Sequence, residues 1–238
     1  MENQYRVKLS EYFKAQHLFE GQGQILDLVK IAQGWETEIY SLSLEHEVDD
    51  EAHSKSLILR MYNGDGAEGK SFKEFRAMSR LYEVKFPVPR VYHLETNRAI
   101  LGKPFVVMEK VDGQSMGELL GTSSSKVREE YIRLFGRIFV DLHALDIKSF
   151  LADRSIFPDP TIYDTPDKYM IKMMEQARSA LGQFKNTSFG QILDWLVDHP
   201  QAMHISEGKL STIHQDYHFN NILIKGDGQP SVIDWTNF

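Results

Sequence analysis

The sequence predicts an α+β fold in two lobes, an antiparallel sheet followed by a mainly helical region. The first observation is the order of the elements, because five strand-like segments lie within residues 1–111 and mainly helical segments follow them. The second is size, since 238 residues with 42% hydrophobic composition suffice for two small lobes that share a cleft. The third is a change of character after VDGQSM, which places the boundary at Asp112 and Gly113. We therefore expect an N-lobe of residues 1–111 and a C-lobe of residues 112–238.

The expected N-lobe holds five strands and two helices. Alternating or continuous apolar segments predict the strands, and apolar side chains at helical spacing predict the helices. In chain order the expected elements are a helix over 5–20, strands over ILDLVKIAQG and IYSLSLEHE with a turn at Gly34, a strand over SLILRMY, a helix over SFKEFRAMSRLYEV, and extended segments over FPVPRVYHLE and LGKPFVVMEKV. VDDEAHSKS and NGDGAEG are expected as polar loops. Ser71 is the expected N-cap of the second helix, with Glu74 at the capping-box position.

The expected C-lobe begins with helices and ends with short strands. Amphipathic spacing predicts helices over residues 126–145, 166–183 and 188–198, and the proline-rich segment SIFPDPTIYDTP is expected as a loop. The last stretch predicts strands over STIH, NILIK and SVIDW, with GDGQP as the turn between the last two. These short strands place a hairpin region at residues 211–236.

Composition excludes several classes of function. The chain has 34 acidic and 27 basic residues and a net charge of -7, so it has no overall basic field for nucleic acid or an anionic membrane. It has no cysteine, which rules out disulfides, thiolate zinc sites and a cysteine nucleophile. The N-terminus has no signal-peptide core, and no stretch approaches the ~20 apolar residues of a membrane span. We expect a soluble, cytoplasmic protein without a nucleic-acid or membrane partner, and make no prediction of its oligomeric state.

The segment HQDYHFNN, residues 214–221, indicates the chemistry. Phosphoryl transfer from ATP needs a carboxylate that orients or deprotonates the acceptor hydroxyl, oxygen ligands for magnesium, and a cation for the phosphates. Asp216 precedes Asn221 by five residues, and Asp234 ends the next apolar strand. We expect the hairpin to bring these three side chains to one edge of a small sheet.

A second interpretation of the same segment is a metal-dependent hydrolase. His214, Asp216 and His218 alternate at every second position, so on a strand all three could face one way and bind a hydrolytic metal ion. This interpretation leaves Asn221 and Asp234 without a role.

The residues from His214 onward resemble the aminoglycoside phosphotransferase family, the small-molecule relatives of protein kinases. That family's catalytic loop has the form His-Gly-Asp-x-x-x-x-Asn and is followed by Ile-Asp-Trp. Here the two segments read HQDYHFNN and VIDW, with Gln215 in place of the glycine. The resemblance covers roughly residues 25–238 and implies a protein-kinase-like fold with a sheet-rich N-lobe and a helical C-lobe. Such proteins continue with further C-lobe helices, so we expect an incomplete C-lobe, truncated at the C-terminus.

The resemblance implies a role for each matching residue. Asp216 is the expected catalytic residue, and Asn221 and Asp234 are the expected magnesium ligands. Arg60 stands where protein kinases have the lysine that contacts the nucleotide phosphates, and Glu74 stands where they have its carboxylate partner. Without the C-terminal motif, Arg60 and Glu74 would be interpreted as a structural ion pair.

The nucleotide-binding residues are implied in the same way. The loop AQGWETEIY has one glycine where protein kinases have three, so we expect Gly34 and Thr37 near the phosphates. FVVMEKVDG resembles the hinge, in which backbone groups of Glu109 and Val111 would contact adenine. The expected cofactors are ATP, or GTP, and Mg²⁺.

Together these implications predict an ATP-dependent phosphotransferase that acts on a hydroxyl of a small molecule. An aminoglycoside-like antibiotic, an amino alcohol or a sugar would each suit the motif, because a family name is not a substrate assignment. Two alternatives stay open, an inactive or truncated nucleotide-binding module and the metal-dependent hydrolase.

Overall fold

A computed structural model describes residues 2–19, 24–34, 36–48, 51–180, 188–199 and 210–236. The chain forms two compact units, one of Met1–Phe139 with Ile213–Phe238 and one of Val140–Thr212. The C-terminal hairpin belongs to the first unit because it returns to the N-terminal part of the chain, where the Val232 N–H donates to Pro87 O at 2.7 Å. The lobe boundary expected at Asp112 and Gly113 is a different division of the chain and stays a prediction.

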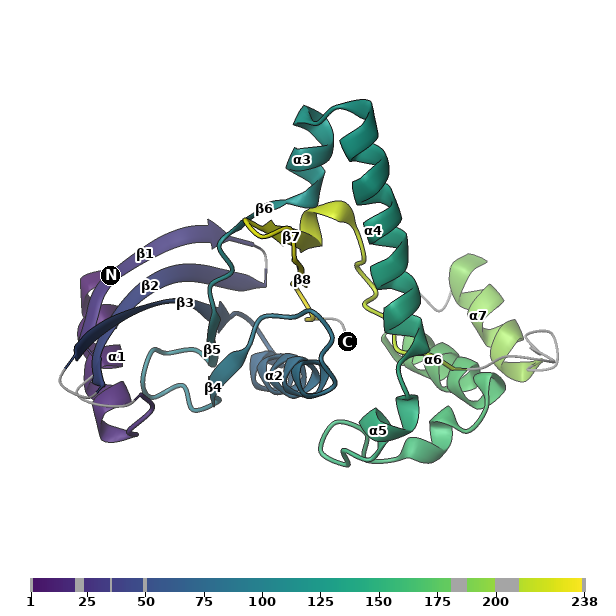
Figure 1. The fold of residues 1–238 in the computed structure, drawn as a ribbon. Helices are drawn as coiled ribbons and strands as arrows, with labels where there is room; N and C mark the ends of the chain where they lie inside the picture. Colours follow the sequence, from purple (N-terminus) through teal and green to yellow (C-terminus); the bar gives the residue numbers. More distant parts are fainter. Residues whose placement is uncertain are drawn as a thin grey trace. The chain divides into compact units, whose positions relative to one another are not determined.

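A five-stranded antiparallel sheet and two helices form the N-terminal part of the first unit (Figure 1). The strands lie in the order β1-β2-β3-β5-β4, and their number agrees with the prediction. The elements are α1 (Glu2–Ala15), β1 (Gln24–Gln33), β2 (Thr37–Val48), β3 (Glu51–Tyr62), α2 (Ala67–Glu83), β4 (Val91–Glu95) and β5 (Phe105–Glu109).

The two faces of this sheet carry different side chains, because neighbouring residues of a strand point to opposite faces. On β3, Leu57 and Leu59 belong to a buried apolar cluster that also contains Phe13 of α1. Arg60 points to the other face, where it pairs with Glu74 of α2. The two helices therefore pack against opposite faces of the sheet.

Helix α2 begins earlier than predicted. Its first residue is Ala67, which is fully buried, and Gly66 before it has a φ of 76°, a left-handed conformation that glycine adopts without strain. Ser71 lies inside the helix, where its Oγ donates to Glu68 O at 2.9 Å. The predicted N-cap at Ser71 and capping box at Glu74 are therefore wrong, and so is the loop predicted over the end of NGDGAEG.

The polar connection expected over VDDEAHSKS is also largely wrong. Strand β2 continues to Val48 and β3 begins at Glu51, with residue pairs that run without a break from Thr37 opposite Tyr62 to Val48 opposite Glu51. A continuous backbone ladder satisfies the N–H and C=O groups whatever the side chains are, so the polar sequence does not end the strands. Residues 49–50, the expected loop tip, lie outside the described residues.

A second, three-stranded sheet carries the C-terminal hairpin. Its strands are β6 (Gly113–Ser115), β7 (Ile222–Lys225) and β8 (Pro230–Val232), in the order β6-β7-β8. Gly113 is required for the approach of β6 to β7, because a Cβ there would lie 2.5 Å from Ile224 O. The strand predicted over STIH does not form, since β6 and β8 already occupy both edges of β7.

The turn between β7 and β8 is the one predicted. The Lys225 N–H donates to Gln229 O, and the Gly228 N–H donates to Lys225 O, each at 2.9 Å. Gly228 has a φ of 81°, so the Asp-Gly pair of GDGQP supplies the left-handed residue that the turn requires.

The remaining described elements are helical. They are α3 (Met116–Thr122), α4 (Ser125–Ala144), α5 (Ile147–Leu151), the 3₁₀ helix η1 (Pro160–Tyr163), α6 (Pro166–Ala180), α7 (Ser188–Asp198) and the short 3₁₀ helix η4 (Phe219–Asn221). The three long helices match the predictions, except that the end expected at residues 181–183 lies outside the described part of the chain. None of the helices that the structure describes has the length and apolar composition needed to cross a membrane.

Candidate active site

His214 orders the loop that the sequence motif defines. Its side chain is buried, its Nε2 donates to Ile233 O at 2.9 Å, and its Nδ1 accepts the Asp216 N–H at 3.3 Å. Burial lowers the pKa of His214, which keeps the ring neutral and so preserves Nδ1 as an acceptor. The ring therefore ties the backbone of Asp216 to the end of the hairpin.

Gln215 adopts a conformation that glycine adopts more readily. Its φ is 64°, in the left-handed region, which costs a residue with a Cβ about 1 kcal/mol. Glycine at this position in the resembled motif is explained by the same backbone geometry. The turn at Gln215 lets the Asp216 N–H face back toward the His214 ring.

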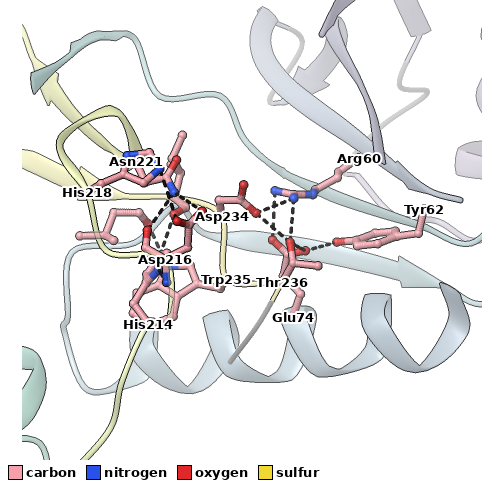
Figure 2. Close-up of polar contacts among 12 residues, drawn as sticks. Arg60, Tyr62, Glu74, His214, Asp216, His218, Asn221, Asp234, Trp235 and Thr236 are labelled. Carbon is pink, nitrogen blue, oxygen red and sulfur yellow. Dashed lines mark hydrogen bonds and ion pairs between the residues drawn. The ribbon is translucent and has the colours of Figure 1, made fainter. Parts of the chain in front are cut away.

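Asp216 and Asn221 lie side by side at the start of β7 (Figure 2). The Asn221 Nδ2 donates to the Asp216 backbone O at 3.1 Å and to its Oδ2 at 3.3 Å. Because the amide nitrogen faces Asp216, the Asn221 Oδ1 is left as an oxygen ligand. The Asp216 side chain is half exposed, so an acceptor molecule could reach it.

His218 lies next to the Asp216 carboxylate. Its Nδ1 accepts the Asn220 N–H at 3.2 Å, so the ring hydrogen of the neutral form is on Nε2. That Nε2 is 3.6 Å from Asp216 Oδ1. His218 therefore caps η4 and presents an N–H toward the carboxylate.

Asp234 follows β8 and reaches the same edge of the sheet. The Ile233 N–H donates to Asn221 O at 2.9 Å, which brings the residue after it beside Asn221. Asp234 Oδ1 accepts from Arg60 Nη2 at 2.6 Å and from Thr236 Oγ1 at 2.7 Å, whereas its Oδ2 has no hydrogen-bond partner among the described residues. Burial opposes ionisation, but the Arg60 guanidinium and the hydrogen bonds lower the pKa of Asp234 overall.

Arg60 links the sheet to both carboxylates. The side chain is 9% exposed, and its Nη1 lies 3.2 Å from Oε1 of Glu74, so the pair expected from the sequence is present. Its Nη2 also donates to Thr236 Oγ1 at 2.8 Å. Burial raises the pKa of the Glu74 carboxyl, although the nearby guanidinium opposes this effect.

Two members of this network are not in the predicted set. Tyr62 donates its hydroxyl to Glu74 Oε2 at 2.6 Å, and Thr236 contacts both Arg60 and Asp234. Each stands two residues from a predicted member, Tyr62 after Arg60 and Thr236 after Asp234. That spacing is the only sequence signal that could have indicated them.

The residues expected at the nucleotide base and phosphates make no side-chain hydrogen bond to this network among the described residues, although Thr37 lies opposite Tyr62 in the β2–β3 pairing. The Glu109 N–H donates to Arg90 O at 2.7 Å, and the Gly34 N–H donates to Thr37 O at 2.8 Å, so neither amide is free. Thr37 is buried, and Val111 is half buried just after β5. Any contact of Glu109 with a base would therefore use its carbonyl oxygen.

The hydrolase interpretation fails on geometry. Both ring nitrogens of His214 are used in hydrogen bonds to the backbone, so this ring cannot bind a metal ion. Across the described ranges of the chain, no three His, Asp or Glu side chains are placed to hold a metal ion together. The alternation that suggested three ligands requires a strand, and residues 214–218 do not form one.

Comparison with known sequences identifies one family. A family model described as the phosphotransferase enzyme family (APH) matches residues 27–238. Two curated proteins match over part of the chain. Acyl-CoA dehydrogenase family member 11 of Rattus norvegicus is 26% identical over 170 residues, and the probable acyl-CoA dehydrogenase IBR3 of Arabidopsis thaliana is 22% identical over 174 residues. In each case the match covers 68% of this chain and 20% of the relative, so the chain spans about a fifth of the length of these proteins.

Solved structures show the same fold. A Ralstonia eutropha JMP134 protein classed with the aminoglycoside phosphotransferases superposes with a TM-score of 0.59 at 19% identity, covering 96% of this chain and 64% of that one. The gentamicin complex of APH(2")-IIa has a TM-score of 0.59 at 15% identity, covering 97% and 70%. An APH(2") enzyme bound to GDP and kanamycin has a TM-score of 0.53 at 15% identity, covering 90% and 68%. These likenesses confirm the predicted fold class.

Proposed function

Because the chain belongs to the phosphotransferase enzyme family, we propose that it transfers the terminal phosphoryl group of a nucleoside triphosphate to a hydroxyl of a small molecule. The observation that carries this proposal is the arrangement of Asp216, Asn221 and Asp234 around the end of the hairpin. A half-exposed carboxylate lies beside an amide oxygen and a second carboxylate oxygen, neither of which accepts a hydrogen bond from the described residues, and a buried guanidinium lies next to them. Phosphoryl transfer requires this combination of groups.

The donor set fits a magnesium ion. Mg²⁺ prefers oxygen ligands, and the site offers an amide oxygen, Asn221 Oδ1, and a carboxylate oxygen, Asp234 Oδ2. Both atoms lack hydrogen-bond partners among the described residues. The lowered pKa of Asp234 keeps this carboxylate ionised and ready to bind a cation. A magnesium ion held there would neutralise charge on the phosphate oxygens.

Asp216 is the proposed catalytic residue. Its carboxylate would accept the proton of the acceptor hydroxyl as that oxygen forms a bond to the terminal phosphorus, while the bond from this phosphorus to the bridging oxygen breaks and the nucleoside diphosphate leaves. Asn221 holds one Asp216 oxygen in place, and His218 presents its N–H to the other. The half-exposed position of the carboxylate supports this role, since an acceptor must reach it from solvent.

Arg60 is the proposed cation for the phosphates. Glu74 fixes the guanidinium from the α2 side, as expected for a positioning partner. Gly34 and Thr37 are proposed to line the phosphate path, and the carbonyl of Glu109 and the backbone of Val111 to meet the base. Both ATP and GTP are candidates, since one structural neighbour was solved with GDP.

The acceptor class follows from the relatives only as a set of candidates. Two structural neighbours were solved with kanamycin or gentamicin, which supports an aminoglycoside-like or amino-alcohol acceptor. The curated relatives are named as acyl-CoA dehydrogenases, which adds a hydroxyacyl-CoA to the candidates. Sugars complete the panel.

The test is a screen for nucleotide consumption. Purified protein is incubated with Mg²⁺ and ATP or GTP and with aminoglycosides, amino alcohols, sugars and hydroxyacyl-CoA thioesters, and the phosphorylated acceptor is identified by mass spectrometry. We expect at least one acceptor to be phosphorylated, and Asp216→Asn to lower turnover by about 10²–10⁴-fold.

Asp227→Asn is the matched control, because Asp227 lies in the turn of the same hairpin and its side chain accepts the Gln229 N–H. The asparagine oxygen can accept the same hydrogen bond, so turnover should hold. If the protein binds the nucleotide but phosphorylates none of the acceptors tested in a way that requires Asp216, the inactive-module alternative is established instead.

A further inference from the structure

Thr236 occupies a central position between the two carboxylates and the guanidinium. Its Oγ1 lies 2.7 Å from Asp234 Oδ1, 2.8 Å from Arg60 Nη2 and 3.5 Å from Glu74 Oε2 (Figure 2). A hydroxyl has one hydrogen to donate and two lone pairs with which to accept. Arg60 can only donate, so the Thr236 hydrogen goes to a carboxylate, and the shorter distance assigns it to Asp234.

Asp234 needs an orienting contact because its backbone does not supply one. The residue lies past the end of β8, and its φ of 66° is outside the extended region, so the pleat of a strand does not direct its side chain. Two donors, Arg60 Nη2 and Thr236 Oγ1, both contact Oδ1. Together they leave Oδ2 as the Asp234 oxygen without a hydrogen-bond partner among the described residues.

The two donors differ in how firmly they are tied to Asp234. Arg60 belongs to β3 and is the group proposed to contact the nucleotide phosphates, which would compete with Asp234 for the guanidinium. Thr236 is two residues from Asp234 on the same backbone. Thr236 would therefore keep its hydrogen bond to Asp234 if the Arg60 guanidinium moved to bind a phosphate.

Trp235 anchors the segment that carries both residues. Its ring is fully buried, its Nε1 donates to Val232 O at 3.0 Å, and it packs against the ring of His214 with centroids 4.3 Å apart. With the residue between them fixed, the Asp234 and Thr236 side chains have little freedom relative to each other.

We propose that Thr236 is a positioning residue whose hydroxyl holds one oxygen of Asp234 and so presents the other to the divalent metal ion. This inference rests on the proposed function, since it assigns Asp234 as a metal ligand. It extends that function to a residue that the catalytic motif does not include.

The experiment compares Thr236→Val, which keeps the shape and removes the hydroxyl, with Thr236→Ser, which keeps the hydroxyl. Affinity for Mn²⁺ alone, as a probe of the metal site, is measured by electron paramagnetic resonance. We expect Thr236→Val to weaken Mn²⁺ binding about tenfold, through the loss of one hydrogen bond to a charged group, and Thr236→Ser to restore it. With an acceptor in hand, Thr236→Val should raise the Mg²⁺ concentration for half-maximal rate more than it lowers kcat at saturating Mg²⁺.

Tyr62→Phe is the control for a purely structural effect, because it removes a second hydroxyl from the same network, one that contacts Glu74 rather than Asp234. It should lower the melting temperature without the tenfold shift in Mn²⁺ affinity. Wild-type Mn²⁺ affinity in Thr236→Val, or an equal loss in Tyr62→Phe, would overturn the positioning role and leave the proposed function intact. If Mn²⁺ does not bind the wild-type chain, or binds it equally well after Asp234→Asn, both the inference and the metal assignment behind it fail.

Discussion

A buried glutamate lies on each side of the five-stranded sheet, Glu38 in β2 and Glu74 in α2, and the surroundings of the two differ. On the face that packs against α1, Glu38 of β2 accepts hydrogen bonds from Lys103, from Lys30 at 3.2 Å and from the Tyr40 hydroxyl at 2.9 Å. On the other face, Glu74 accepts from the Tyr62 hydroxyl, and Arg60 is the one cation that pairs with it among the residues that the structure describes.

The difference lies in how completely each carboxylate is neutralised. Lys30 and Lys103 both form ion pairs with Glu38, and hydrogen bonding to Lys103 lowers the pKa of this carboxyl to about 2 despite burial. Glu74 shares its only cation with Asp234, and no hydrogen bond reaches its Oε1 or the Arg60 Nε among the described residues. Burial accordingly raises the pKa of Glu74.

The comparison separates a cluster whose charges are paired internally from the one proposed to act on a nucleotide. The Glu38 carboxylate accepts hydrogen bonds from Lys30, Tyr40 and Lys103, so its charge is neutralised by residues on the α1 face of the sheet. Asp234 Oδ2 accepts no hydrogen bond from the described residues, so it is the atom that a metal ion would use, and a nucleotide phosphate would compete with Asp234 for the Arg60 guanidinium.

The largest effect should come from breaking the buried Arg60–Glu74 pair. Glu74→Ala leaves the Arg60 charge buried with half of its partners, so we expect the free energy of unfolding to fall by about 3–5 kcal/mol. Glu83→Ala is the matched control, because Glu83 is in the same helix and pairs with Arg80 at the exposed surface, where a pair contributes about 0–1 kcal/mol. Urea denaturation measures both. Similar losses in the two variants would show that the Arg60–Glu74 pair has no special weight.

Replacing the shared cation tests whether its geometry matters for activity. Arg60→Lys keeps the charge but replaces a planar fork with a single ammonium, which cannot reach Glu74 and Asp234 in the same way. We expect kcat/KM for the nucleotide to fall about 10–100-fold, equivalent to about 1.4–2.7 kcal/mol. Lys103→Arg on the opposite face is the control and should leave kcat/KM within about twofold, since the side-chain partners described for Glu38 are Lys103, Lys30 and Tyr40, none of which belongs to the proposed site. Unchanged kinetics in Arg60→Lys would contradict the proposal that the Arg60 guanidinium contacts the nucleotide phosphates.

Lowering the pH should change the stability contributions of the two glutamates in opposite directions. The pKa of Glu38 is lowered in the folded state, so its stabilising contribution is present above the ordinary value of 4.5 and is lost as pH falls toward about 2. Glu38→Gln should therefore cost about 1–2 kcal/mol at pH 7 and progressively less below pH 4.5. The pKa of Glu74 is raised, so its proton uptake favours the folded state as pH falls, and its contribution to the pH dependence has the opposite sign. The measurement is the free energy of unfolding from pH 7 to pH 2.5. If it changes with pH equally in Glu38→Gln and in the wild type, the lowered pKa of Glu38 is contradicted.

Much of the candidate site could be predicted because its spacing is local. Asp216, Asn221 and Asp234 lie within one hairpin, and a hairpin of given turn length places the ends of its strands together whatever else the chain does. The Arg60–Glu74 pair could be predicted from the strand and the helix that carry it, although the capping role assigned to Glu74 was wrong. Helix α2 begins one turn earlier because Gly66 and the buried Ala67 set its start.

Other features required the folded chain. The predicted strand over STIH is absent because β6, from a segment about 100 residues earlier in the chain, takes the free edge of β7. The contact of Thr236 with Glu74 joins residues 162 positions apart, and a threonine after Ile-Asp-Trp carries no signal of that partner.

The sequence by itself determined the fold class, the phosphotransferase motif and the residue types of the site, because these depend on periodicity and on short spacings within single elements. Tertiary structure decided which oxygen of Asp234 is free, which cation Glu74 must share and which hydroxyls complete the network. Those properties depend on the packing of β3, α2 and the C-terminal hairpin against one another, and only the folded chain brings charges so distant in sequence within hydrogen-bonding range.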